Sequence, residues 1–209
     1  MIATSGDPNW FSSNPVVEGA VYSPVYAGLD RFRAVIPADR PQRTFAVIRD
    51  ARDTAVSWYF SLRYSHSTKS PGIAGPREVL SRLSVEDGLA MVIASHLRTA
   101  IWIQRTWLES GLKVFRYEEL RQRQHETFND LFDFCQLDLS ARKRRRIVER
   151  NSFERRTWWR FGRESKRSHL RKGMPGDWKN YFTGMHKNLF RAHYGDILIQ
   201  AGYEKDDNW

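Results

Sequence analysis

Residues 45–60 read FAVIRDARDTAVSWYF, and this stretch decides the fold. Its first four residues, 45–48, are apolar and β-prone, which predicts a short buried strand. Asp50 and Asp53 follow, and acids at these positions suit the amino end of a helix, so we predict a helix over 51–63. A strand that leads directly into a helix is the repeating unit of α/β folds.

Arg49 stands at the carboxyl end of this predicted strand. Ser57 follows eight residues later, about two helical turns away if the whole span is helical. Both side chains can then face a phosphate at the strand–helix junction, where open α/β sheets bind ligands. In the alternative interpretation Arg49 pairs with Asp53, and Ser57 is an ordinary helix residue. The residues alone leave both interpretations open.

A second stretch, RKGMPGDWKNYFT at residues 171–183, also suits an anion. Arg171 and Lys172 supply two cations, and an arginine can hold a phosphate through two parallel hydrogen bonds. Gly173 and Gly176 carry no Cβ, so the backbone can approach a ligand closely there. The alternative is a basic turn that precedes an amphipathic helix.

Taken together, these segments resemble the sulfotransferase family, whose members use 3′-phosphoadenosine 5′-phosphosulfate (PAPS) as the sulfuryl donor. Residues 47–60 resemble the family's 3′-phosphate motif, a strand followed by Arg-Asp-x-x-Asp and then a Ser. VFRYEEL at 114–120 resembles its Tyr-Glu-Asp-Leu element, and IVERNSFERR at 147–156 resembles its Ser-Phe-Glu element. The stretch at 171–183 is close to the family consensus. All four occur in the family's order, and the match runs from about residue 45 to 203.

The resemblance implies two groups of nucleotide-binding residues. Those expected to hold the 3′-phosphate are Arg49, Ser57, Arg171, Lys172 and Gly173. Those expected near the adenine are Tyr117, Ser152 and Phe153. An aromatic ring offers a stacking face and a tyrosine adds a hydroxyl, which agrees with this assignment. Without the resemblance, ordinary core packing would be the default interpretation of both rings.

The beginning of the chain departs from the family pattern. Sulfotransferases normally carry a strand followed by a Pro-Lys-Ser-Gly-Thr-Thr-Trp loop, which holds the 5′-phosphosulfate. Residues 1–10 read MIATSGDPNW, without Lys or Arg, and Pro8 removes an amide donor. We therefore predict a surface turn at residues 4–10 and a sulfotransferase domain that is N-terminally truncated.

The catalytic residues stay unknown from the sequence. Many family members use a His ahead of the Arg-Asp-x-x-Asp motif as general base, whereas the first His of this chain is His66. Among the acids that precede the motif, Asp30 is the candidate we favour, because a carboxylate can serve as a base when it is suitably placed. The default interpretation of Asp30 is nevertheless a solvent-exposed acid beside Arg31 or Arg33. His66 follows the Ser57 helix and could reach an acceptor pocket, but its default interpretation is a surface-loop histidine.

Composition suits one soluble domain over residues 1–209 that binds an anion. The 34 Lys and Arg against 24 Asp and Glu give a net charge of +10, which suits a nucleotide but equally a nucleic acid or membrane surface. Cys135 is the single cysteine, so it forms no intrachain disulfide or cysteine-rich metal site. Residues 1–20 lack the pattern of a signal peptide, and no apolar run is long enough to span a membrane. We predict a cytoplasmic protein.

The alternation of strands and helices predicts a three-layer α/β/α fold with a parallel sheet. The resemblance implies the P-loop-NTPase-like sulfotransferase version of that fold. Residues 1–40 are expected to be irregular, 65–77 to form a loop, and 155–175 to form a flexible lid, with Trp158 and Trp159 at the acceptor entrance. The expected elements are a short strand near 20–22, strands 44–48 and 112–116, and helices 51–63, 84–110, 124–135, 140–150 and 182–201.

Three functions compete. We predict an enzyme, a sulfotransferase that moves a sulfuryl group from PAPS to a hydroxyl or amine on a small-molecule or carbohydrate acceptor, and no motif requires a metal. The second hypothesis is a non-catalytic remnant that keeps the 3′-phosphoadenosine half-site. The third is a basic nucleic-acid-binding module, suggested by ARKRRRIVER at 141–150. Ile147 and Val148 sit where that helix would face the core, which favours a solvated helix face over nucleic acid. Oligomeric state is not encoded in any motif.

Overall fold

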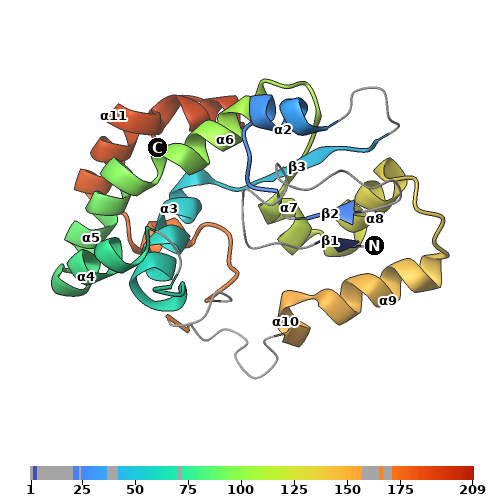
Figure 1. Cartoon of the computed structure of the whole chain (residues 1–209), viewed down its shortest axis with the longest axis horizontal. Helices are drawn as coiled ribbons and strands as arrows, with labels where there is room; N and C mark the ends of the chain where they lie inside the picture. The colour runs from blue at the N-terminus through green and yellow to red at the C-terminus, as the bar shows by residue number, and fades with distance from the viewer. Residues whose placement is uncertain are drawn as a thin grey trace.

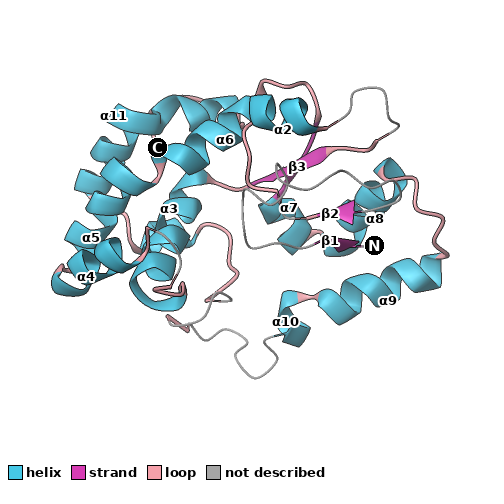
Figure 2. Cartoon of the chain, in the orientation of Figure 1, coloured by secondary structure: helices cyan, strands magenta, loops and turns pink. Residues whose placement is uncertain are grey.

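The computed structural model describes residues 2–3, 21–23, 25–36, 42–69, 72–156, 165–166 and 171–209 of the chain. Its α-helices are α2 (Leu29–Val35), α3 (Ala51–Phe60), α4 (Ala74–Arg82), α5 (Val85–Met91), α6 (Arg98–Leu108), α7 (Tyr117–Gln122), α8 (Gln124–Phe134), α9 (Ala141–Asn151), α10 (Phe153–Arg156) and α11 (Gly184–Gln200). The described residues also form two π-helices, η1 (Ser61–Ser65) and η2 (Val92–His96), and a 3-10 helix, η4 (Asp177–Asn180) (Figure 2).

The strands that matter for the site are β3 (Phe45–Ile48) and β4 (Lys113–Arg116), which pair in parallel with Ile48 opposite Arg116. Parallel neighbours need a long crossover, and the helices from α3 to α6 provide it. A second parallel pair joins β1 (Ile2–Ala3) to β2 (Val21–Tyr22). Parallel strands linked by helices confirm the predicted α/β class.

Figure 1 shows α3, α4, α5 and α11 gathered at one end of the molecule and α8 and α9 at the other, with β3 between them. The main hydrophobic core lies in the first group, where α3, α5, η2 and α11 pack together. Tyr59, Ile93 and Phe190 are among its fully buried side chains. Burying a large apolar side chain stabilises a protein by about 1.5–3 kcal/mol, so this core holds α3, and the strand end before it, in place.

The predicted strand–helix junction forms as expected, with β3 leading into α3. Asp50 caps α3, because its side chain accepts a hydrogen bond of 2.9 Å from the backbone N–H of Arg52. The helix then continues into η1, whose π-helical turn includes Ser61 to Ser65. Apolar spacing alone did not distinguish this wider turn from an α-helix.

The predicted long helix over 84–110 is wrong in its continuity. Ser84 does cap its beginning by accepting from the N–H of Asp87, but α5 gives way to η2, and α6 starts only after Leu97. Leu97 is fully buried. The apolar residues at helical spacing do lie in the core, as predicted. Their spacing does not reveal the π-helical turn η2 between α5 and α6.

Among the described α-helices, the sequence prediction missed four, of which the short α10 overlaps the start of the expected lid. Helix α2 lies within the expected irregular segment 1–40, α4 begins inside the expected loop 65–77, and α7 starts directly after β4. The loop was predicted because 65–77 contains two prolines and two glycines, yet one of these, Pro76, occupies the first turn of α4, where backbone N–H groups have no partner within the helix. Proline is therefore compatible with that position.

Candidate functional site

The site begins where the two parallel strands end. Arg49 directly follows β3 and Tyr117 directly follows β4, so the β3–β4 register places them side by side. The guanidinium carbon of Arg49 lies 4.8 Å from the centroid of the Tyr117 ring. Nε of Arg49 is buried and has no hydrogen-bond partner among the described residues. A buried unsatisfied donor is costly, and an anion at this strand edge would satisfy it.

Asp53 joins this strand edge to the stretch that begins at Arg171. Its buried carboxylate accepts hydrogen bonds from the backbone N–H groups of Gly176, at 2.7 Å, and Trp178, at 2.8 Å. Burial raises the pKa of Asp53, while Arg49 and the two amide donors lower it, and the net pKa is raised. The carboxylate thus connects two parts of the chain more than 120 residues apart.

The two cations of the second stretch meet on one carboxylate. Arg171 is buried, and its Nη2 lies 2.5 Å from one oxygen of Asp177. The ammonium of Lys172 binds the other oxygen. The guanidinium of Arg171 also lies 4.5 Å from the centroid of the Phe60 ring, on the C-terminal end of α3. These contacts place Arg171 next to α3 and join Lys172 to Arg171 through Asp177.

Gly173 packs against Phe153, one of the residues predicted to lie near the adenine. Its φ of +64° favours glycine, and a Cβ there would lie 2.6 Å from the Phe153 ring, so a larger residue does not fit. Arg121 of α7 donates from Nε to the carbonyl oxygen of Gly173 at 2.9 Å, and its guanidinium carbon lies 4.8 Å from the centroid of the Phe153 ring. The structure therefore brings Phe153 and Gly173 together, and their contact with a nucleotide stays a prediction.

Ser57 and Ser152 are placed differently. Ser57 is half-buried on α3, four residues after Asp53, so the two share a helix face. The Ser152 hydroxyl accepts a hydrogen bond from the N–H of Arg155 at 3.2 Å, as a helix-capping residue does. Their predicted contacts with the nucleotide stay predictions.

Arg52 is the main site residue that sequence reasoning missed. Its guanidinium is almost fully buried, pairs with Asp50 at 2.7 Å and with Glu204 at 2.6 Å, and contacts two indole rings that pack edge to face. The centroids of these rings, Trp178 and Trp209, are 4.0 and 4.5 Å from its Cζ. The sequence showed an arginine between two acids at the start of a helix, but the indoles come from distant parts of the chain.

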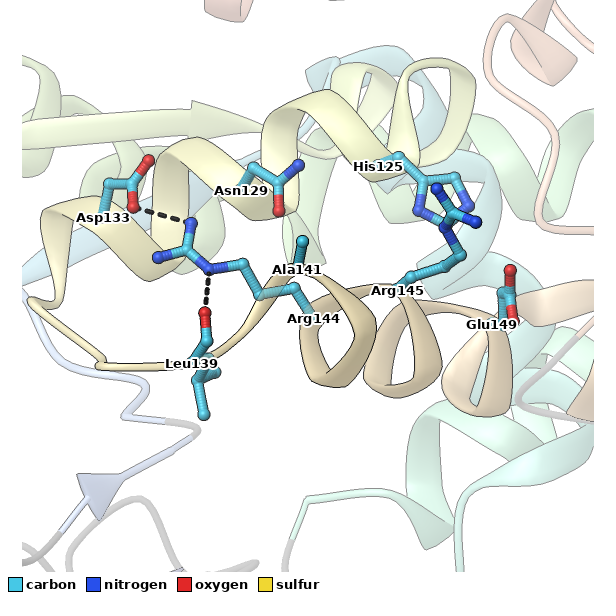
Figure 3. Close-up of a pocket in the computed structure, with 8 residues that line it drawn as sticks. All are labelled: His125, Asn129, Asp133, Leu139, Ala141, Arg144, Arg145 and Glu149. Atoms are coloured by element: carbon cyan, nitrogen blue, oxygen red, sulfur yellow. Dashed lines mark hydrogen bonds and ion pairs between the residues drawn. The ribbon is translucent and has the colours of Figure 1, made fainter.

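A separate surface hollow lies between α8 and α9 (Figure 3). Arg144 crosses it, bound to Asp133 at 2.6 Å and to the carbonyl oxygen of Leu139 at 3.0 Å. Its other lining residues include His125, Arg145 and Glu149, so both acidic and basic side chains line the hollow. None of the predicted nucleotide-binding residues lines it.

Of the remaining predicted features, the structure places Asp30 and His66, and the others lie wholly or largely outside the described residues. Asp30 is exposed in the first turn of α2, and the ring of His66 lies 5.1 Å from that of Trp58. The predicted turn at 4–10 lies outside the described residues, as do Trp158, Trp159 and most of the predicted lid. The described helices include none long and apolar enough to cross a membrane.

A family model described as the sulfotransferase domain matches residues 39–202. The chain belongs to the sulfotransferase family. Sulfotransferase 1A1 of Bos taurus is 25% identical over 188 residues, which cover 82% of this chain and 59% of the relative. Sulfotransferase 1B1 of Mus musculus is 27% identical over 162 residues, covering 70% and 50%. The resemblance inferred from the motifs is confirmed.

The fold agrees with a solved sulfotransferase structure. Mouse sulfotransferase SULT7A1 complexed with PAP matches with a TM-score of 0.55 and 18% identity, over 77% of this chain and 62% of that one. This likeness confirms the predicted sulfotransferase fold. The chain spans 59% and 50% of the lengths of the two curated relatives described above.

Proposed function

We propose that this sulfotransferase-family chain binds PAPS and functions in the transfer of its sulfuryl group to a hydroxyl or amine on a small-molecule or carbohydrate acceptor. The observation that carries the proposal is the buried, unpartnered Nε of Arg49 at the carboxyl edge of the β3–β4 pair. Asp53, in contact with the 176–178 backbone, joins that edge to the segment bearing Arg171 and Lys172.

The residues present suit the 3′-phosphoadenosine part of the donor. Arg49, Arg171 and Lys172 are cations on two segments joined by Asp53, and guanidinium groups bind phosphate oxygens well. Phe153 offers an aromatic ring for the adenine and lies against Gly173. Arg121 already lies over the Phe153 ring.

In the proposed reaction, the acceptor oxygen or nitrogen attacks sulfur as the bond between sulfur and the 5′-phosphate oxygen breaks. The products are 3′-phosphoadenosine 5′-phosphate and the sulfated acceptor, and the acceptor proton leaves to a base. The named residues serve to bind and orient the donor, since holding a reactant in place lowers the entropic part of the barrier.

Non-catalytic nucleotide binding is the second candidate function. The observation that favours it is that all the assigned residues serve the 3′-phosphate and the adenine, whereas none is assigned to the 5′-phosphosulfate. Nucleotide binding and turnover therefore need separate measurements.

Calorimetric titration with 3′-phosphoadenosine 5′-phosphate tests the proposal. Each lost hydrogen bond to a charged group costs about 1.5–3 kcal/mol, so Arg49→Ala/Arg171→Ala is expected to weaken binding at least about 100-fold. The matched control is Arg82→Ala/Arg105→Ala, which removes two arginines that pair with Glu78 and Asp196. Failure of the folded wild-type chain to bind, or equal affinities of the two double variants, would refute the site. Sulfuryl transfer from PAPS to an acceptor panel then separates turnover from binding alone.

A further inference from the structure

Asp177 holds both cations of the 171–178 segment, and neither the motifs nor the proposed function gave it a role. Its side chain is 1% exposed, and one oxygen binds Arg171 while the other binds Lys172. Asn180 adds a third donor at 2.8 Å. These groups arrange a guanidinium and an ammonium around a single buried carboxylate.

The backbone on each side of Asp177 is itself fixed. The two N–H groups that Asp53 accepts belong to Gly176 and Trp178, the neighbours of Asp177 in the chain. Trp178 also packs on Arg52. Asp177 therefore cannot withdraw easily when an anion arrives, which argues against a carboxylate that leaves the site to admit its ligand.

Lys172 keeps the capacity to bind a ligand while it contacts Asp177. An ammonium carries three N–H donors, and the contact with Asp177 uses one of those on Lys172. The Lys172 side chain is 30% exposed, so an anion can reach it. Long side chains lose rotamer freedom when a ligand immobilises them, and prior fixation reduces that loss on binding.

We propose that Asp177 is a positioning residue that sets Arg171 and Lys172 for a phosphate group on the ribose 3′ position. This inference rests on the proposed function, because it assigns a specificity determinant to the same nucleotide site. Asp177 acts through the two cations, so its removal weakens recognition of the 3′-phosphate selectively. A carboxylate that merely competed with the phosphate would give the opposite result, tighter binding when it is removed.

The test compares 3′-phosphoadenosine 5′-phosphate with adenosine 5′-phosphate, which lacks the 3′-phosphate. Asp177→Asn is expected to weaken the first at least about 10-fold and to change the second less than about 2-fold. Asp196→Asn is the control, because it removes one carboxylate that is paired with Arg105 instead. Unchanged or tighter binding of the bisphosphate by Asp177→Asn would overturn the inference, as would an equal loss for both nucleotides.

A double-mutant cycle separates positioning from a general effect on folding. In an Arg171→Ala/Lys172→Ala background, Asp177→Asn is expected to add no further loss of bisphosphate affinity, since the cations through which it acts are gone. A loss equal to that in the wild-type background would contradict the inference. If Asp177→Asn does not fold, Asp177→Glu replaces it, and the same selective loss is expected from displacement of the carboxylate. A wild-type chain that binds neither nucleotide would instead refute the proposed function.

Discussion

Replacing Arg52 with methionine tests whether the buried ion pair beside the site stabilises the fold. Methionine keeps much of the apolar length but removes the cation, leaving the Asp50 carboxylate, which is 8% exposed, without its partner. Breaking a buried pair by removing one member costs about 3–5 kcal/mol. The loss of attraction to the two indoles acts in the same direction. We expect Arg52→Met to lower the unfolding free energy by about 3–5 kcal/mol, measured by urea denaturation.

Arg105→Met is the matched control for this experiment. Arg105 pairs with Asp196 at 2.5 Å, but that pair is largely exposed, and such pairs contribute about 0–1 kcal/mol. Adding Asp50→Asn to Arg52→Met should recover part of the loss, because it removes the unpaired buried charge. Equal destabilisation by Arg52→Met and Arg105→Met would show that the reasoning from burial is wrong.

Two further predictions concern the 171–178 segment. Gly173→Ala should lower the unfolding free energy by more than about 1–2 kcal/mol, because the added Cβ overlaps the Phe153 ring in addition to the cost of a left-handed backbone at a non-glycine residue. Gly75→Ala, with open space around its Cβ, should not lower it. Thermal unfolding measures both. Burial raises the pKa of Asp177, but hydrogen bonds from its basic neighbours and an amide outweigh it, and the net pKa lies below the ordinary 3.8. Because a depressed pKa stabilises the fold above the unfolded value, the stability difference between wild type and Asp177→Asn should be complete at neutral pH and shrink as pH falls below about 3.8. Urea titrations that show a constant difference down to pH 2 would contradict this.

The part of the fold that rests on local signals was predictable. The strand over 45–48, the helix that follows it and the cap at Ser84 each depend on neighbouring residues. The break at Leu97 was not, because the apolar residues on both sides face the same core whether or not the helix continues. Pro76 favoured a loop in the prediction, but a proline is compatible with the first turn of a helix, and the sequence did not show where α4 begins.

The candidate site was predictable as a set of motifs but not as a network. The sequence offered pairing between Arg49 and Asp53 as one interpretation of the strand end. In the structure Arg49 does act on the pKa of Asp53, yet the hydrogen bonds of the carboxylate go to Gly176 and Trp178. No spacing rule reports a contact between residues 123 positions apart.

The hydrogen bonds between Asp53 and the 176–178 backbone restrict the amino acid at position 53 more than the amino acids at positions 176 and 178. One partner is a specific side chain, whereas the other two are main-chain N–H groups that every residue except proline carries. As far as this attachment is concerned, position 178 can carry any residue with a backbone N–H, whereas the φ of +79° at Gly176 favours glycine there. A single substitution at position 53 removes both hydrogen bonds at once. The position where one mutation most easily releases the 176–178 backbone therefore lies in α3, outside that segment.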